Sequence, residues 1–156
     1  NCETWPRRRR TAPQRRMAAL HPTGQALTVS RRADVPARIY HLTLSDEWDE
    51  ATKQRVAYRR STLGKSLEEE GFIHCSFASQ VQAIADVLFQ GREDVVLLTI
   101  DASRVEAQIR VENLDGGEEM FPHIYGPLPL GAVTKANGVP LSLDGRLLVD
   151  VLLIDM

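Results

Sequence analysis

The sequence predicts an α+β fold with a mixed or split antiparallel sheet and two main helices. Two helical patterns occur, both early in the chain, and strand-like segments lie before, between and after them. This order is not the regular strand and helix alternation of parallel sheets. At 156 residues the chain has room for one domain with a real hydrophobic core.

The first helix is predicted by a capping residue followed by acidic residues. Ser45 is expected to cap it, and Asp46 and Glu47 in the first turn suit the positive end of the helix dipole. The helix is expected to run to about Tyr58. A polar, partly cationic loop follows over residues 59–66, around a glycine.

The second helix has the clearest periodicity in the chain. It is expected to start near Ala78 or Ser79 and to end at Gly91. Its apolar stripe follows the spacing i, i+3, i+4, i+7 and i+8 and consists of Val81, Ile84, Ala85, Leu88 and Phe89. Before it, residues 67–70 predict one helical turn that Gly71 stops.

Strands are predicted by period-two alternation and by apolar runs. Residues 95–100 are apolar on both faces, which indicates a central strand. Pro122 and Pro127 should limit regular pairing in the sheet segment 121–128. The other predicted strands are 38–43, 71–76, 108–112, 132–136 and 146–154.

Charge divides the chain into a basic leader and an acidic domain. Residues 1–38 hold nine arginines against two acidic residues, a net charge of +7, whereas the remainder holds 10 basic against 19 acidic residues, a net charge of −9. We expect residues 1–35 to be a disordered, dispensable Arg-rich leader, and residues 36–156 to be one domain. A mis-assigned start upstream of Met17 explains this composition, and the alternative is a targeting or nucleic-acid-binding segment.

Cysteine usage and hydropathy favour a cytoplasmic protein. Cys2 and Cys75 form neither a disulfide framework nor a paired-cysteine zinc motif. No apolar run is long enough for a signal peptide or for a membrane span. The acidic domain disfavours nucleic acid as a partner.

Three of the four histidines lie in sheet segments and point to one cleft. Alternation places His41 with Thr43 on one face of its strand, and His74 with Ser76 on one face of another. The segment 121–128 adds His123 and Tyr125. Each buried imidazole needs partners, so a shared cleft is a better explanation than three unrelated structural positions.

Several chemistries could use such a cleft. Zinc could take His41, His74 and His123, but their spacing is not that of a metal motif, and we expect no metal. Alternation sends the Cys75 thiol away from the imidazole before it, so an inert buried thiol is expected. Either Glu112 or Glu119 could act as an acid or base, and the spacing does not select between them.

Four motifs occur in order along the chain: IYH at 39–41 followed by Trp48, GFIHCS at 71–76, GREDVVLL at 91–98 and FPHIYGPL at 121–128. They give the chain a close resemblance to the bacterial domain of unknown function 952 family. It covers roughly residues 38–136. It implies a fold like the ADP-ribosyltransferase catalytic domain, a split sheet around a cleft that holds NAD.

The pattern is similar to the His-His branch of these enzymes, which includes the RNA 2'-phosphotransferases. This resemblance implies that His41 and Thr43 contact the nicotinamide ribose, and that His74 and Ser76 lie at the nicotinamide. Phe72 stands where the phosphotransferases have an arginine, which argues against a 2'-phosphate substrate. The glutamate of typical transferases has no certain counterpart.

The leading hypothesis is an NAD-dependent enzyme that cleaves the nicotinamide glycosidic bond or transfers ADP-ribose to an unknown acceptor. His41, His74, His123 and Tyr125 would be its catalytic residues, and His41, Thr43, His74 and Ser76 would bind the nucleotide. The main alternative is a non-catalytic domain that binds a nucleotide or another small molecule in the same cleft. A zinc hydrolase is the third.

Overall fold

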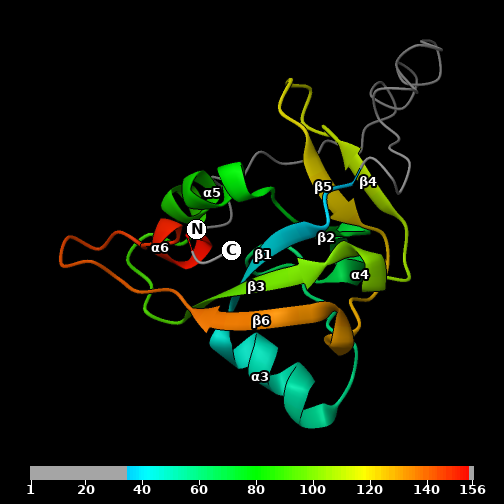
Figure 1. Cartoon of the computed structure of the whole chain (residues 1–156), viewed down its shortest axis with the longest axis horizontal. Helices are drawn as coiled ribbons and strands as arrows, with labels where there is room; N and C mark the ends of the chain where they lie inside the picture. Colours follow the sequence, from blue (N-terminus) through cyan, green and yellow to red (C-terminus); the bar gives the residue numbers. More distant parts are fainter. Residues whose placement is uncertain (1–34, 155–156) are drawn as a thin grey trace.

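The computed structural model describes residues 35–154 as two small sheets with helices around them (Figure 1). The strands are β1 (Arg38–Leu44), β2 (Ile73–His74), β3 (Val95–Asp101), β4 (Ile109–Glu112), β5 (Phe121–Ile124) and β6 (Val133–Gly138). The α-helices are α3 (Ser45–Gln54), α4 (Leu67–Glu70), α5 (Val81–Leu88) and α6 (Asp150–Leu153). Short 3-10 turns are η3 (Ala78–Gln80), η4 (Ala102–Arg104) and η5 (Leu130–Ala132). This is the mixed α+β class that the sequence predicts.

The first sheet is antiparallel with the order β1-β3-β6. Its middle strand β3 has six consecutive buried residues, Val95 to Ile100, because side chains on both of its faces enter hydrophobic clusters. The prediction of a central strand from this apolar run is confirmed.

The second sheet is antiparallel with the order β2-β5-β4, and its middle strand contains Pro122. The Pro122 carbonyl accepts a hydrogen bond from the Cys75 N–H at 2.9 Å, and proline has no N–H to return one. The N–H and C=O of one strand residue lie on the same side, so the missing donor falls on the β2 side. Regular β2 pairing therefore stops after His74, whereas the β4 side stays paired.

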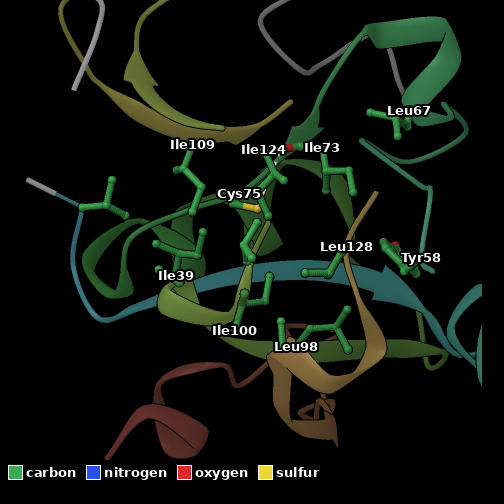
Figure 2. Close-up of a cluster of buried hydrophobic side chains, with 14 of the residues drawn as sticks. Ile39, Tyr58, Leu67, Ile73, Cys75, Leu98, Ile100, Ile109, Ile124 and Leu128 are labelled. Atoms are coloured by element: carbon green, nitrogen blue, oxygen red, sulfur yellow. Dashed lines mark hydrogen bonds between the residues drawn. The ribbon is translucent and has the colours of Figure 1, made fainter. Parts of the chain in front are cut away.

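A backbone bridge joins the two sheets. Tyr40 of β1 and Ser76, just after β2, exchange two backbone hydrogen bonds of 2.9 and 2.7 Å. Between the sheets lies one hydrophobic cluster, which includes Ile39, Ile73, Leu98 and Ile124 (Figure 2). The bridge and this cluster hold the histidines of β1 and β2 close together.

The other face of the first sheet is covered by α5. The predicted stripe is confirmed: Val81, Ala85, Leu88 and Phe89 are buried, and Ile84 packs against the same cluster. They contact Tyr40 and Leu42 in a second hydrophobic cluster. The helical turn α4 also has its predicted bounds, and Gly71 ends it with φ +88°.

Three local predictions are wrong. Ser45 makes no side-chain cap; Leu44 is the N-cap of α3, and the Ser45 N–H bonds the Asp94 carbonyl at 2.8 Å. The helix stops at Arg55, which is left-handed, so Tyr58 lies outside it. Residues 146–154 form an isolated Leu147 bridge and then α6 instead of a strand.

Two further predictions concern the leader and membrane-spanning helices. The predicted disordered leader, residues 1–35, lies outside the described residues apart from Val35, so it and the domain bounds stay predictions. Among residues 35–154, no helix combines the length and apolar character needed to cross a bilayer.

Candidate functional site

Two histidines on neighbouring strands of the second sheet are hydrogen-bonded to each other. His74 on β2 and His123 on β5 are partners in the antiparallel register, and His74 Nδ1 lies 3.0 Å from His123 Nε2. The other nitrogen of His123, Nδ1, lies 2.9 Å from Oε2 of Glu112 on β4. Three strands thus contribute one continuous chain of hydrogen bonds, which we call the imidazole relay (Glu112, His123 and His74).

Aromatic side chains surround the relay, and none of its three residues is more than 8% exposed. The Phe72 ring stacks on His123 with centroids 4.2 Å apart and planes at 27°. The Tyr125 hydroxyl donates a hydrogen bond to Glu112, and the Arg110 guanidinium lies 4.6 Å from the Tyr125 ring centre. Exclusion of water lowers the local dielectric, which strengthens each hydrogen bond in the chain.

The hydrogen-bond pattern fixes where protons lie in the relay. Tyr125 and His123 both approach the same oxygen, Glu112 Oε2, so that oxygen is an acceptor twice, as in an ionised carboxylate. His123 Nδ1 therefore carries a proton. When each imidazole carries one proton, His123 Nε2 accepts from His74 Nδ1–H, and the lone pair of His74 lies on Nε2.

His41 is the anchor between β1 and β2. Its Nδ1–H donates to the His74 carbonyl at 2.6 Å, and its Nε2 lies 2.9 Å from the Tyr58 hydroxyl. The same hydroxyl lies 2.6 Å from Thr43 Oγ1. His41 and Thr43 do share one face of β1, as predicted, and Tyr58 connects them.

Burial keeps both imidazoles at the sheet junction neutral near pH 7. It lowers the pKa of His41 to about 4, although the His74 carbonyl partly opposes the shift. Burial, followed by the nearby His123 and His41, also holds the pKa of His74 well below its usual range. The pKa of Tyr58 is raised, first by burial, so its hydroxyl stays protonated.

A small cavity of about 20 Å³ lies where β1 and β2 meet α5. We call it the His74 cavity. Its volume exceeds the 10–15 Å³ or so that one water needs, so it has room for about one water molecule. It is lined by His41, Leu42, Ser61, Thr62, His74, Ser76, Ile84, Leu88 and Phe89.

A larger groove of about 600 Å³ adjoins the start of β1 and η3. We call it the Arg38 groove. It is lined by Pro36, Ala37, Arg38, Tyr40, Phe77, Ala78 and Ser79. Tyr40 of the groove and Ser76 of the His74 cavity are the two residues of the bridge between the sheets.

The structure places the predicted site residues on two sides of His74. His41, His74 and Ser76 line the His74 cavity, but His123 and Tyr125 do not. They lie on the far side of His74, inside the relay. His123 and Tyr125 therefore do not line the His74 cavity, because they pack against residues of β2 and β4, and a cleft shared by all three histidines and Tyr125 stays a prediction.

The sequence left the choice between Glu112 and Glu119 open, and it did not point to two further contributors, Tyr58 and Ser61. Glu112 is the carboxylate of the relay, while Glu119 accepts a hydrogen bond from Gln80. The alternation of residues 109–112 carried a usable signal, because it places a carboxylate on a predicted strand. Tyr58 and Ser61 had no such signal: they come from a loop whose path is set by the bridge to Leu128 and by the hydrogen bond of Ser61 Oγ with the His74 N–H.

Cys75 packs with Ile73 in the cluster between the sheets, on the opposite face from His74. Burial raises the pKa of its thiol, which disfavours the thiolate needed for nucleophilic chemistry. Across residues 35–154, no group of three or more histidine, cysteine, aspartate or glutamate side chains is arranged to hold a metal ion.

Comparisons with known proteins give a family. No curated protein matches the chain. A crystal structure of protein CC0527 from Caulobacter crescentus is 32% identical with a TM-score of 0.65, and the alignment covers 75% of this chain and 98% of that one. The solution structure of the same protein is 31% identical, with a TM-score of 0.55 and coverage of 71% and 91%. The profile of a family described as protein of unknown function, DUF952, matches residues 42–136, so the chain belongs to that family.

Proposed function

We propose that this protein is an enzyme of ADP-ribosyltransferase-like fold that acts on NAD and breaks the bond between nicotinamide and ribose. The observation that carries the proposal is the imidazole relay, which links the buried Glu112 carboxylate through the His123 imidazole to His74, a residue of the His74 cavity. A relay of this kind supplies a general base held in one orientation.

The cost of burying the relay supports a functional role. A carboxylate and two imidazoles buried together lose hydration, and apolar residues of similar volume would fill the space at lower cost. Clusters of buried groups with strongly shifted pKa values are typical of active sites. His74 combines burial, a shifted pKa and a place in a cavity wall.

The surroundings offer places for the rest of the nucleotide. The Arg38 groove has a guanidinium for the pyrophosphate and the Phe77 ring for the adenine. His74 and Ser76 lie in the wall of the His74 cavity, where the nicotinamide end would bind. A nicotinamide ring is larger than this cavity, so NAD binding would displace the Ser61–Thr62 loop or α5.

His41 and Thr43 take a different part in this proposal. Both are bonded to Tyr58, and His41 also to the His74 carbonyl, so their polar atoms are engaged within the protein. We assign His41 to holding β1 against β2, and through it to positioning His74. Direct contact of His41 or Thr43 with ribose would need the Tyr58 hydroxyl to move.

The size difference between the two sites favours one alternative, a domain that binds a nucleotide without turnover. The Arg38 groove of about 600 Å³ can hold a nucleotide, while the His74 cavity of about 20 Å³ holds only a water-sized group. If the His74 region never opens, NAD or a related nucleotide would bind in the groove and stay intact.

The test measures NAD binding by titration calorimetry and nicotinamide release by chromatography, on the full chain. We expect binding and release in the wild type, loss of release in His74→Ala, and loss of binding in Arg38→Ala. Ser103→Ala, at an exposed site in η4, is the control and should behave as the wild type. Binding without release would favour the alternative, and no binding to the folded chain would exclude NAD.

A further inference from the structure

We propose that the Arg38 groove selects adenine over other purine bases, and that the backbone N–H and C=O of Arg38 are the groups that recognise the base. The inference rests on the proposed function, which assigns the groove to the adenine end of NAD, and deepens it by naming adenine nucleotides as the substrate class. Arg38 does not line the His74 cavity.

The groove lies where a ladder of backbone hydrogen bonds stops. Tyr40 and Ser76 exchange two such bonds, of 2.9 and 2.7 Å. In an antiparallel ladder the next exchange would join the residues two positions further along each chain, which are Arg38 and Ala78. Ala78 instead begins the η3 turn, so the chain leaves β1, and both residues line the groove.

The backbone of Arg38 therefore faces the groove without a partner strand. Alternate residues of a strand direct their N–H and C=O to the same edge, so Arg38 shares the edge at which Tyr40 meets Ser76. The opposite edge belongs to β3, where the Ala37 carbonyl accepts a hydrogen bond from the Ala102 N–H at 3.0 Å. In the part of the chain that the structure describes, nothing bonds the Arg38 N–H or C=O.

Adenine complements this donor and acceptor pair. Its N6 amino group donates and the neighbouring ring nitrogen accepts, so adenine can pair with Arg38 much as Ser76 pairs with Tyr40. Guanine and hypoxanthine have an acceptor, O6, in place of the amino group, which would face the Arg38 carbonyl. Their other edge carries donor and acceptor in the opposite order, so pairing there would turn the base over and displace its ribose.

The remainder of the groove suits any purine nucleotide. Its volume of about 600 Å³ lies within the range of about 300–1,000 Å³ that small-molecule sites have. The half-buried Phe77 ring offers a face for stacking, and the exposed Arg38 guanidinium offers a positive charge for phosphate. Stacking and charge do not distinguish one purine from another, so the backbone pair is the part that selects the base.

The test compares AMP with IMP, the matching nucleotide of hypoxanthine, by titration calorimetry on the full chain. We expect IMP to bind roughly 10- to 100-fold more weakly than AMP, the discrimination usual for a bidentate contact with a base. Purine riboside monophosphate lacks the amino group without adding an acceptor, and its affinity should fall between the two. Equal affinities for AMP and IMP, or no binding of AMP to the folded chain, would overturn the inference.

Two variants at position 38 separate the backbone from the side chain. Arg38→Ala and Arg38→Pro both lose the guanidinium, but only proline removes the N–H. Arg38 is the first residue of β1, an edge strand, where proline is tolerated. The probes are adenosine and inosine, followed by NMR titration, because without phosphate they do not need the guanidinium.

Arg38→Ala should keep the preference for adenosine, whereas Arg38→Pro should lose it. An equal response of Arg38→Ala to the two nucleosides would assign the preference to the side chain and overturn the inference, as would a retained preference in folded Arg38→Pro. If Arg38→Pro does not fold, the calorimetry and Arg38→Ala still decide.

The outcomes separate this inference from the proposed function. Nicotinamide release from NAD together with equal affinities for AMP and IMP keeps the proposed function and rejects adenine selection by the backbone. A preference for AMP without nicotinamide release from the folded chain keeps the selection and rejects the proposed enzyme in favour of a nucleotide-binding domain.

Discussion

His41 makes the stability of the fold depend on pH. Burial sets its pKa at about 4 in the folded chain, against an ordinary value of 6.5, so the unfolded chain binds the extra proton between these values. The contribution of the buried, neutral His41 to the stability of the folded chain is fully present above pH 6.5 and is lost as the pH falls to 4. One pKa unit corresponds to about 1.4 kcal/mol. We therefore expect the titration of His41 to lower the free energy of unfolding by about 3 kcal/mol as the pH falls through this range.

Urea denaturation at a series of pH values from 4 to 7.5 measures this loss. The comparison is with His41→Gln, which keeps hydrogen-bonding groups but has no proton to take up in this range. The difference in unfolding free energy between the two proteins should shrink as the pH falls. Parallel curves for the two proteins would show that His41 does not titrate with unfolding.

Tyr58 should matter for stability through its hydroxyl. Tyr58→Phe leaves His41 Nε2 and Thr43 Oγ1 in the interior without the hydroxyl between them. We expect a cost of about 1–3 kcal/mol, the usual range when a buried polar group loses its partner. A double-mutant cycle with Thr43→Val, read by urea denaturation, should give a non-zero coupling energy. Strict additivity of the two changes would contradict the contact.

At the scale of elements, the approach of the chain after β5 to the loop before β4 requires a glycine. A Cβ at Gly126 would lie 2.6 Å from the Ala107 Cβ, which is closer than side chains tolerate. We expect Gly126→Ala to destabilise the protein by about 1–3 kcal/mol, as overpacking does. Thermal unfolding measures it.

A compensating change tests the cause. Combining Gly126→Ala with Ala107→Gly removes the close contact and should restore most of the lost stability. Gly131→Ala is the control: its added Cβ meets nothing within 4 Å, so the melting temperature should barely change. If the double variant is as unstable as Gly126→Ala, the contact is not the cause.

Elements with a complete local signal could be predicted from the sequence, and those set by distant contacts could not. The stripe of α5 and the Gly71 stop of α4 are local, and both are confirmed. Residues 146–154 are apolar enough for a strand, but the first sheet pairs β1, β3 and β6 and does not include this segment. That segment packs instead against the face of α5, through Leu147 and Val149.

The candidate site shows the same division. Strand phase predicts that His41 and Thr43 share a face, and the structure agrees because Tyr58 bonds both. The alternation of side chains along a strand does not predict which strands are neighbours. The relay from β4 through β5 to β2 could therefore not be predicted from the sequence. The carboxylate partner of His123 depends on that strand order, which long-range pairing decides.

At the scale of the whole molecule, the two sheets share a hydrophobic cluster and are joined by the Tyr40–Ser76 bridge and by the hydrogen bond from His41 to the His74 carbonyl. Figure 2 shows Cys75 inside this cluster, among side chains of both sheets. The thiol therefore becomes accessible only when the sheets separate. Because the histidines of the site lie on strands of both sheets, the same separation would take the site apart.

Cys75 can report this separation directly. In a Cys2→Ser background it is the chain's remaining cysteine, and it is 1% exposed. Burial also raises the pKa of the thiol, so the folded state offers little reactive thiolate. We expect labelling by a thiol reagent to be slow and governed by global unfolding, giving the same free energy as urea denaturation. Fast labelling under native conditions would instead show that the two sheets open locally, and the same opening could then admit a nucleotide to the His74 cavity.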